Sequence, residues 1–298
     1  MEIQGHRDER SRRIRLGMVG GGQDAFIGAV HRIAARLDDH YVLVAGALSA
    51  SPEKAVASGR ALGLSEGRIY TSFAEMATAE SDRSDGIEAV AIVTPNHLHV
   101  EIATIFLEQG IHVICDKPLS ASLGDAKALA GMVERTGLVF ALTHTYAGYP
   151  MVREARQRIA DGQLGDIRVV RVDYAQDWLA EPIEESGQKQ AAWRTDPDQA
   201  GAGGSIGDIG THAFHLAGFV SGLTVTSLAA DLTSFVPGRR VDDNAHVLMR
   251  FEGGARGMLW ASQIAVGNEN ALSLQVYGTR GGLTWSQEDP NRLWLTPI

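Results

Sequence analysis

One stretch near the N-terminus limits the folds open to this chain more than any other. An apolar run at residues 14–19 breaks at three consecutive glycines, Gly20 to Gly22, and a helical pattern begins near Phe26 and continues to about Leu37. Further apolar runs separated by helical patterns follow at residues 41–48, 89–93, 112–115 and 139–142. Strands that alternate with helices predict a parallel sheet covered on both faces, with ligands bound beyond the carboxyl ends of its strands.

After Pro150 the pattern changes. A helix to about Ala160 and a strand at residues 167–174 precede a long irregular segment, and strands then dominate, at residues 224–231, 245–251, 255–263 and 272–277. Turn residues at Glu252-Gly253-Gly254 and at Gly281-Gly282 predict hairpins. We therefore expect an antiparallel meander with one face packed on helices, while the other covers a ligand or a second subunit.

These patterns predict a three-part chain of α/β class. Residues 1–13 form a charged tail, residues 14–143 a parallel-sheet domain, and residues 144–298 an α+β domain with an open, mainly antiparallel sheet.

Composition and charge favour a small-molecule ligand. The net charge of −9 argues against nucleic acid or an anionic membrane as a partner, because either calls for a basic face. The single cysteine, Cys115, lies in an apolar run and leaves no disulfide framework, so a reducing cytoplasm fits. No stretch is long enough to span a membrane, and the arginines near residue 12 precede a segment too short and too glycine-rich for an export signal.

The glycine turn fits a dinucleotide-binding fingerprint. Gly20-x-Gly22-x-x-Ala25 lies after a strand and before a helix, which is the context that this motif needs. In a second interpretation Gly28 is the third glycine and residues 23–25 extend the turn. In both, backbone N–H groups at the helix N-terminus face a pyrophosphate.

The end of the second strand normally decides between NAD and NADP, because a carboxylate there holds the ribose diol and repels a 2′-phosphate. The tip of this strand carries no acidic residue, and Ser49 and Lys54 permit NADP. Serines before a proline are also ordinary turn and capping residues, so the choice between NAD and NADP stays open.

Polar residues follow two further strands. Thr94-Pro95-Asn96-His97-Leu98-His99 comes after residue 93, and Asp116-Lys117-Pro118 comes after residue 115. The prolines stiffen both turns and hold the polar side chains beside them. Lys117 could stabilise an alkoxide beside a nicotinamide ring, although a lysine after a strand is more often a solvated charge.

The segment at residues 201–212 has the pattern of a glycine loop that leads into a helix. Ser205 is the expected N-cap, and Asp208 and His212 lie one helical turn apart on one face. Asp208 could orient His212, which would then accept a proton from a bound hydroxyl. A core helix with a satisfied histidine remains an alternative, and a metal site that adds His215 is the least favoured, so we expect no metal.

Taken together, these motifs resemble those of the Gfo/Idh/MocA oxidoreductases, which include glucose–fructose oxidoreductase, inositol dehydrogenases and levoglucosan dehydrogenase. The glycine fingerprint, Thr-Pro-Asn-x-x-His, the Lys-Pro turn and Gly-Gly-x-x-x-Asp-x-Gly-x-His carry the resemblance, in this order, over residues 14–285. The resemblance implies a Rossmann domain, an antiparallel-sheet domain, and a nicotinamide cofactor that serves sugars, cyclic polyols or their derivatives. We expect a homodimer or homotetramer joined through the second sheet.

The resemblance also implies roles for single residues. Lys117, Asp208 and His212 correspond to the catalytic set, in which His212 takes the hydroxyl proton and Lys117 steadies the oxyanion across the nicotinamide. The residues expected to bind the cofactor are Gly20, Gly22, Ala25, Gly28, Ser49, Lys54, Thr94, Pro95, Asn96, His99, Asp116 and Lys117. Those expected to bind the substrate are Tyr146, Gln176, Asp177, Trp193, Arg194, Asp208 and His212.

Three departures from the family pattern stand out. The chain ends at Pro297-Ile298, where members of the family continue with more strand and helix, so we expect the second domain to be short at its C-terminus, which could leave apolar surface bare or the cleft incomplete. The family usually has Glu-Lys-Pro where this chain has Asp116-Lys117-Pro118, one methylene shorter, and the fingerprint loop is longer by three residues. Two rival functions also remain. One is a sensor that binds the dinucleotide without turnover, and the other an enzyme that recycles a tightly held cofactor during elimination or glycoside cleavage.

Overall fold

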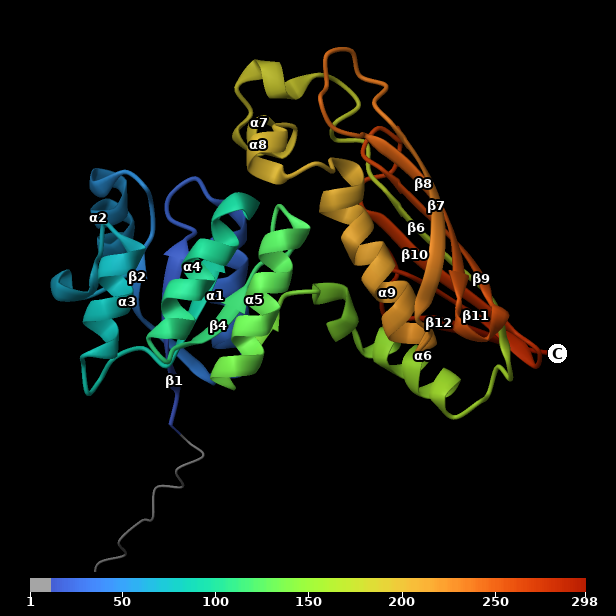
Figure 1. Ribbon diagram of the computed structural model, residues 1–298, viewed down its shortest axis with the longest axis horizontal. Coiled ribbons are helices and arrows are strands. Elements are labelled where there is room, and N and C mark those ends of the chain that lie inside the picture. The colour runs from blue at the N-terminus through green and yellow to red at the C-terminus, as the bar shows by residue number, and fades with distance from the viewer. Residues whose placement is uncertain (1–11) are drawn as a thin grey trace, which may run out of the picture. The chain divides into compact units, whose positions relative to one another are not determined.

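The computed structural model describes residues 12–298, which fold as two compact units that meet in the sequence between Thr143 and His144 (Figure 1). Most of the expected tail lies outside the described residues. Arg12 and Arg13 at its end are exposed and form ion pairs with Glu88 and Asp39. None of the helices in the described part of the chain is long and apolar enough to cross a membrane.

The first unit contains a sheet of five parallel strands in the order β2-β1-β3-β4-β5. The strand bounds are β1 Ile14–Gly20, β2 Tyr41–Ala47, β3 Ala89–Val93, β4 His112–Cys115 and β5 Phe140–Leu142. All five residues of β3, the middle strand, are buried, as expected for a strand covered on both faces. The predicted parallel sheet is confirmed.

Serine side chains cap the starts of three helices in this unit. The Ser51, Ser72 and Ser122 hydroxyls each accept the N–H of the residue three positions on, and Pro52 occupies the first turn of its helix. The helix bounds are α1 Phe26–Leu37, α2 Pro52–Ala61, η2 Glu66–Arg68, α3 Phe73–Ser81, η3 Asn96–Leu98, α4 His99–Glu108 and α5 Leu123–Thr136.

The second unit contains a seven-stranded sheet in the order β12-β11-β10-β6-β9-β8-β7. Its central strand β6 pairs in parallel with β9, and the other neighbouring strands in the described chain pair antiparallel. The strand bounds are β6 Ile167–Ala175, β7 Val225–Thr233, β8 Asn244–Phe251, β9 Arg256–Ser262, β10 Ala271–Gly278, β11 Gly281–Ser286 and β12 Leu293–Pro297. The mainly antiparallel sheet is thus confirmed.

Helices cover one face of this sheet. Figure 1 shows α9 (Thr211–Ser221) lying along the strands with α6 (Pro150–Ala160) beside it, and both bury apolar side chains in the core of the unit. Shorter helical segments complete the unit, namely η4 Thr145–Gly148, η5 Ile183–Ser186, α7 Lys189–Arg194, α8 Pro197–Ala200, the π-helical segment η6 Ile206–Gly210, and η7 Glu252–Gly254.

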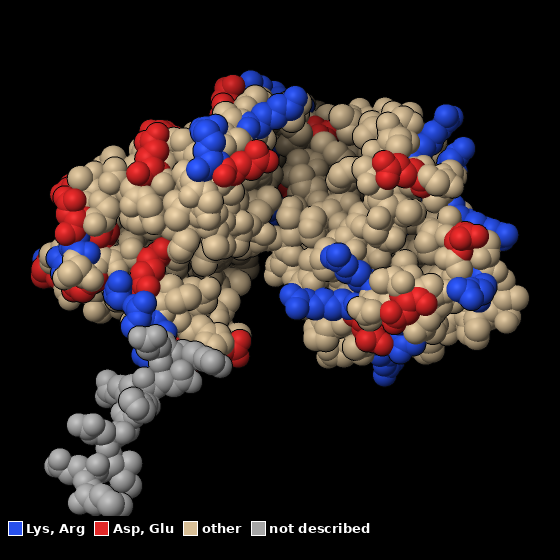
Figure 2. Space-filling model, turned by 60° about the horizontal axis from the view of Figure 1, so that its bottom comes forward, with Lys and Arg blue, Asp and Glu red and all other residues tan. Residues whose placement is uncertain are grey.

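The opposite face of the sheet is open. Along β8, buried and exposed residues alternate, and Leu248 and Met258 are 64% and 45% exposed. The strand register aligns one outward-facing row across the whole sheet, Ala229, Leu248, Met258, Arg171, Gln275, Thr284 and Trp294. Lys, Arg, Asp and Glu side chains are intermingled on the surface that Figure 2 shows.

Two local predictions were wrong. Gly281 and Gly282 begin strand β11, and the turn is made by Thr279 and Arg280, whose N–H groups donate to the carbonyls of Asp166 and Leu164. These tertiary hydrogen bonds place the turn of the hairpin at residues 279–280, immediately before the two glycines. The segment expected to be irregular contains α7 and α8.

Candidate active site

The glycine loop of the first unit is packed too tightly for side chains. Gly20 and Gly21 have left-handed φ values of 81° and 72°, which glycine adopts without strain. A Cβ atom on Gly22 would lie 2.6 Å from the Leu48 carbonyl oxygen and 2.7 Å from Ser58 Oγ. The loop therefore lies against the end of β2, and the Gly22 N–H donates to the Leu48 carbonyl at 3.1 Å.

Gly28 is where helix α1 touches this loop. A Cβ atom there would lie 2.4 Å from Gly21 Cα and 2.6 Å from the Gly21 carbonyl oxygen, well inside van der Waals contact. Ala25 precedes the helix in an extended conformation and is half-buried. The geometry favours the interpretation in which Gly28 is the third glycine and residues 23–25 extend the turn.

The first turn of α2, just after the tip of β2, contains a carboxylate, Glu53, that the sequence interpretation did not single out. The Ser51 hydroxyl accepts the Lys54 N–H and donates to Glu53 Oε2 at 2.8 Å. Ser49 Oγ accepts the Ser51 N–H at 3.2 Å. Glu53 is a negative charge that would oppose a 2′-phosphate, whereas Lys54 would attract one.

His99 joins the two polar turns of the first unit. Its ring is fully buried, with Nδ1 2.7 Å from the Pro118 carbonyl oxygen and Nε2 2.9 Å from that of Thr94. Burial lowers the pKa of His99, against the opposing effect of these carbonyls. Since both ring nitrogens face protein carbonyls, we expect His99 to position the turns rather than contact a cofactor directly.

Thr94 offers an anchor for a bound group. Among residues 12–298, its Oγ1 is buried without a hydrogen-bond partner, which is costly unless a ligand supplies one. Together with the glycine loop, this atom fits a dinucleotide that lies over the carboxyl ends of β1 and β3.

Asp116 and Lys117 follow β4. Asp116 Oδ1 accepts the Thr143 hydroxyl at 2.8 Å and the Lys117 N–H at 3.1 Å, and His31 Nε2 lies 4.0 Å away. Burial opposes ionisation of Asp116, but His31, Thr143 and the charge of Lys117 outweigh it, so the pKa of Asp116 lies below its usual range. Sequence reasoning missed His31 because this residue lies on α1, which is separated from Asp116 in the sequence by most of the first unit.

In the second unit, Asp208 and His212 lie on a helix that starts irregularly. Asp208 belongs to the π-helical segment, and His212 belongs to α9, which follows directly. The predicted N-cap was wrong, since Ser205 already has helical φ and ψ of −58° and −40° and its hydroxyl donates to Asp242 Oδ2. π-Helical turns are rare and occur frequently at functional sites.

The side chains of Gln263 and Arg194 contact the Asp208 carboxylate. Its Oδ2 accepts Gln263 Nε2 at 3.0 Å and lies 3.3 Å from Arg194 Nε. The Arg194 guanidinium in turn lies 4.2 Å from the ring centroid of Trp193. The structure therefore brings Asp208, Arg194 and Trp193 together.

The His212 imidazole is buried among aromatic rings. The Tyr146 ring lies edge-on at 4.8 Å and the His144 ring at 5.9 Å, between centroids. His215 stacks on His144 at 4.0 Å, and burial lowers the pKa of His215. Within residues 12–298, His, Cys, Asp and Glu side chains form no group of three suited to a metal.

A chain of polar contacts connects Tyr146 back to Asp208. The Tyr146 and Tyr174 hydroxyls contact each other, and Tyr174 donates to Asn270 Oδ1 at 2.6 Å, which also accepts Gln176 Nε2 at 3.0 Å. Gln263 Nε2 lies 3.5 Å from Gln176 Oε1 and completes the chain.

Sequence reasoning missed Tyr174, Gln263 and Asn270. They come from β6 and from the ends of β9 and β10, and only the strand order brings them together. Asp177, also expected in the substrate site, accepts the Gly267 N–H at 3.0 Å through Oδ2.

Comparisons with known families define the class. Residues 14–144 match the model of an oxidoreductase family with an NAD-binding Rossmann fold, and residues 152–284 match that of the GFO/IDH/MocA C-terminal domain. The protein is therefore an oxidoreductase with an NAD-binding Rossmann domain, and it belongs to the Gfo/Idh/MocA family.

Its relatives include sugar and polyol dehydrogenases. An oxidoreductase from Sinorhizobium meliloti is 58% identical, with a TM-score of 0.87 over 96% of this chain and 76% of that one. An inositol dehydrogenase homolog from Azotobacter vinelandii, crystallised with NAD+, is 38% identical, with a TM-score of 0.93 over 97% and 75%. Levoglucosan dehydrogenase from Pseudarthrobacter phenanthrenivorans is 30% identical over 310 residues, 94% of this chain and 75% of the relative.

Proposed function

We propose that this protein is an NAD(P)-dependent dehydrogenase that oxidises a CH–OH group of a sugar, a cyclic polyol or a related carbohydrate. The observation that carries the proposal is the continuous set of polar contacts from Asp208 through Gln263, Gln176, Asn270 and Tyr174 to Tyr146, beside His212. Such a set can donate to and accept from several hydroxyls at once, as a polyol requires.

The proton acceptor in this proposal is His212. A buried imidazole can remove the proton of a substrate hydroxyl, and one such general base contributes about 10²–10⁴ in rate. Asp208 contacts a substrate hydroxyl or orients His212, and its charge is balanced by Arg194 at 3.3 Å. Lys117 stabilises the oxyanion that develops on the reacting oxygen.

The first unit would hold the cofactor at residues that fit it. The backbone of Gly20 to Gly22 faces the pyrophosphate, Gly28 lets the helix approach, and Thr94 Oγ1 gains the partner that it lacks among the described residues. A bound nicotinamide would supply the hydride acceptor. Asp116 stays ionised because of the environment described above and can accept a ribose hydroxyl.

The direct test is turnover. The purified protein is incubated with NAD or NADP and a panel of inositols, aldoses and anhydrosugars, and the absorbance of reduced nicotinamide is followed. We expect turnover of at least one panel member. Absence of turnover, together with tight dinucleotide binding, would overturn the proposal in favour of a sensor.

Substitutions then test the residue roles. His212→Ala is expected to lower kcat by roughly two to four powers of ten with little change in cofactor affinity. His40→Ala is the matched control, because that imidazole is exposed in a turn of the other unit. Near-normal turnover by His212→Ala would show that this histidine is not the proton acceptor and has a structural role.

Lys117→Ala is expected to lower kcat as well, with Lys127→Ala on the exposed side of α5 as its control. If Lys117 and His212 act on one transition state, the double variant will be little slower than the worse single variant. Fully multiplicative losses would show that the two residues act on separate steps.

The open face of the second sheet leads us to propose a homodimer or homotetramer. Its outward-facing row contains Leu248, Met258 and Trp294, which are 64%, 45% and 67% exposed. Apolar side chains aligned in this way are typical of a surface that a second subunit covers.

A further inference from the structure

The helix that carries Asp208 and His212 is capped from a distant part of the sequence. Asp242 Oδ1 accepts the Gly204 N–H at 2.8 Å, and Asp242 Oδ2 accepts the Ile206 N–H at 2.8 Å and the Ser205 hydroxyl at 2.6 Å. These are N–H groups that a helix leaves unsatisfied at its start, and a carboxylate also complements the positive end of the helix dipole.

Backbone contacts strengthen the same junction. The Asp242 carbonyl oxygen accepts the Ser205 N–H at 2.8 Å, and a Cβ atom on Gly204 would lie only 2.1 Å from that oxygen. Residue 204 must therefore be glycine for the two segments to approach so closely. Because Asp242 engages three consecutive residues, the start of the helix has little freedom to shift.

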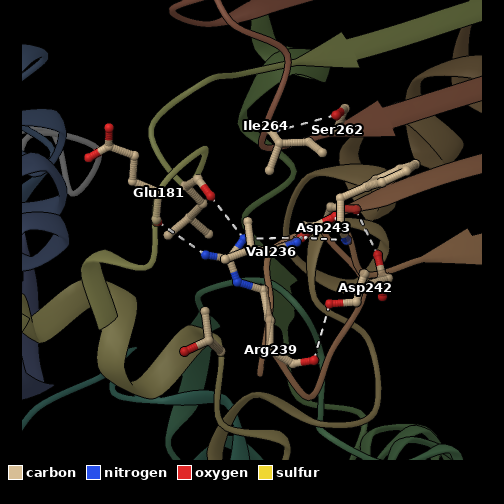
Figure 3. Close-up of polar contacts among 12 residues, drawn as sticks. Glu181, Val236, Arg239, Asp242, Asp243, Ser262 and Ile264 are labelled. Atoms are coloured by element: carbon tan, nitrogen blue, oxygen red, sulfur yellow. Dashed lines mark hydrogen bonds and ion pairs between the residues drawn. The ribbon is translucent and has the colours of Figure 1, made fainter. Parts of the chain in front are cut away.

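The residue that follows Asp242 in the chain forms a buried ion pair. The side chains of Arg239 and Asp243 are fully buried, with Arg239 Nη1 3.2 Å from Asp243 Oδ2. Asp243 Oδ2 also accepts the Val236 N–H at 3.0 Å, and the Asp243 carbonyl accepts the N–H of Gln263, the residue that holds Asp208. Figure 3 shows Asp243 beside the Arg239 guanidinium, which also donates to the backbone carbonyl of Glu181.

Arg239 connects this loop to the segment after β6. Its guanidinium pairs with both oxygens of Glu184, at 2.9 and 3.0 Å, and donates to the Leu179 carbonyl at 2.9 Å. Fork-shaped pairing of this kind fixes direction as well as distance. The loop that presents Asp242 is thus held from two sides, which makes it a rigid support.

We propose that Asp242 is a positioning residue, which fixes the Asp208–His212 segment through the start of its helix. The inference rests on the proposed function for its effect on catalysis. A helix transmits a displacement of its first turn along its axis, and misplacement of a reacting group by about 1 Å can cost about a hundredfold in rate. Asp242 would therefore control turnover without touching substrate.

Asp242→Asn is the principal test, because the amide keeps the size of the side chain but presents an N–H₂ group to donors. We expect kcat to fall by about ten- to a hundredfold, with cofactor affinity unchanged and KM changed less than kcat. The control is Asp231→Asn, an exposed carboxylate on β7. Ser205→Ala removes a single contact of Asp242, and we expect a smaller fall in kcat and a double variant no slower than Asp242→Asn alone.

Amide hydrogen exchange provides a readout that needs no substrate. In Asp242→Asn, exchange should accelerate at residues 203–212 and stay unchanged in the peptides of β6 and β10. Unchanged exchange at residues 203–212 would overturn the proposal, even if the substrate panel gave no turnover. Accelerated exchange with wild-type kcat would also overturn it, because the segment would then not need this support. A failure of the proposed function shows in the wild-type protein, whereas a failure of this inference shows only in the variants.

Discussion

Gly28→Ala should damage the dinucleotide site, although the same substitution usually strengthens a helix. The new Cβ atom would lie 2.4 Å from Gly21 Cα, whereas carbon atoms in contact are about 3.5–4.0 Å apart. Helix α1 or the glycine loop must therefore move by about 1 Å. Overpacking of this size costs about 1–3 kcal/mol, against about 0.5–1 kcal/mol gained from the lower flexibility of alanine.

Gly131→Ala in α5 is the matched control. Its Cβ atom would meet only the flexible end of Arg135, at 3.4 Å, so that variant should gain the same 0.5–1 kcal/mol, roughly, without the steric cost. The difference in free energy of unfolding between the two variants isolates the overpacking, at about 1–3 kcal/mol. Urea unfolding followed by circular dichroism measures it.

Gly28→Ala should also weaken binding of the dinucleotide. If the loop moves, an N–H group loses its bond to the charged pyrophosphate, worth about 1.5–3 kcal/mol, so NAD should bind about ten- to a hundredfold more weakly to Gly28→Ala. Calorimetric titration provides the affinity. Equal urea midpoints for the two variants, with NAD binding as tight as in the wild-type protein, would refute the assignment of Gly28 as the third glycine.

Three further predictions concern other parts of the molecule. Glu53→Gln should raise affinity for NADP relative to NAD, because it removes the carboxylate beside Ser51; an unchanged affinity ratio in calorimetry would place the ribose elsewhere. His215 has a lowered pKa in the folded protein, so the stability that depends on its neutral ring is present above its unfolded pKa of about 6.5 and is lost as the pH falls through the lower folded value. The His215→Phe variant should therefore lose less stability than the wild-type protein when the pH falls from roughly 7.5 to 5, as measured by thermal unfolding. Identical losses in the two proteins would contradict burial as the cause of the lowered pKa of His215. Leu248→Glu, on β8 in the open sheet face, should yield monomers in sedimentation, and an intact oligomer would locate the subunit contact on another surface.

The sequence predicted what depends on local pattern. Alternating strands and helices and the glycine turn were readable because each depends on residues a few positions apart. Asp208 and His212 were found by their spacing on one helix.

The cap of that helix could not be predicted in the same way. Ser205 looks like a cap locally, but Asp242, a stronger acceptor 37 positions away, takes that role and turns the Ser205 hydroxyl into a donor. Tyr174 and Asn270 are 96 positions apart and meet only through the pairing of β6 with β10. Contacts of this kind depend on strand order, which periodicity does not encode.

The place of β6 in its sheet also determines when the second unit can fold. This strand, Ile167–Ala175, has β9 on one side and β10 on the other, so its two edges stay unpaired until residues 256–278 have left the ribosome. The parallel sheet of the first unit needs only residues up to 142. Synthesis should therefore yield a folded nucleotide domain first. While the next stretch of about 80 residues is synthesised, chaperones or the helices of the second unit must cover the unpaired edges of β6.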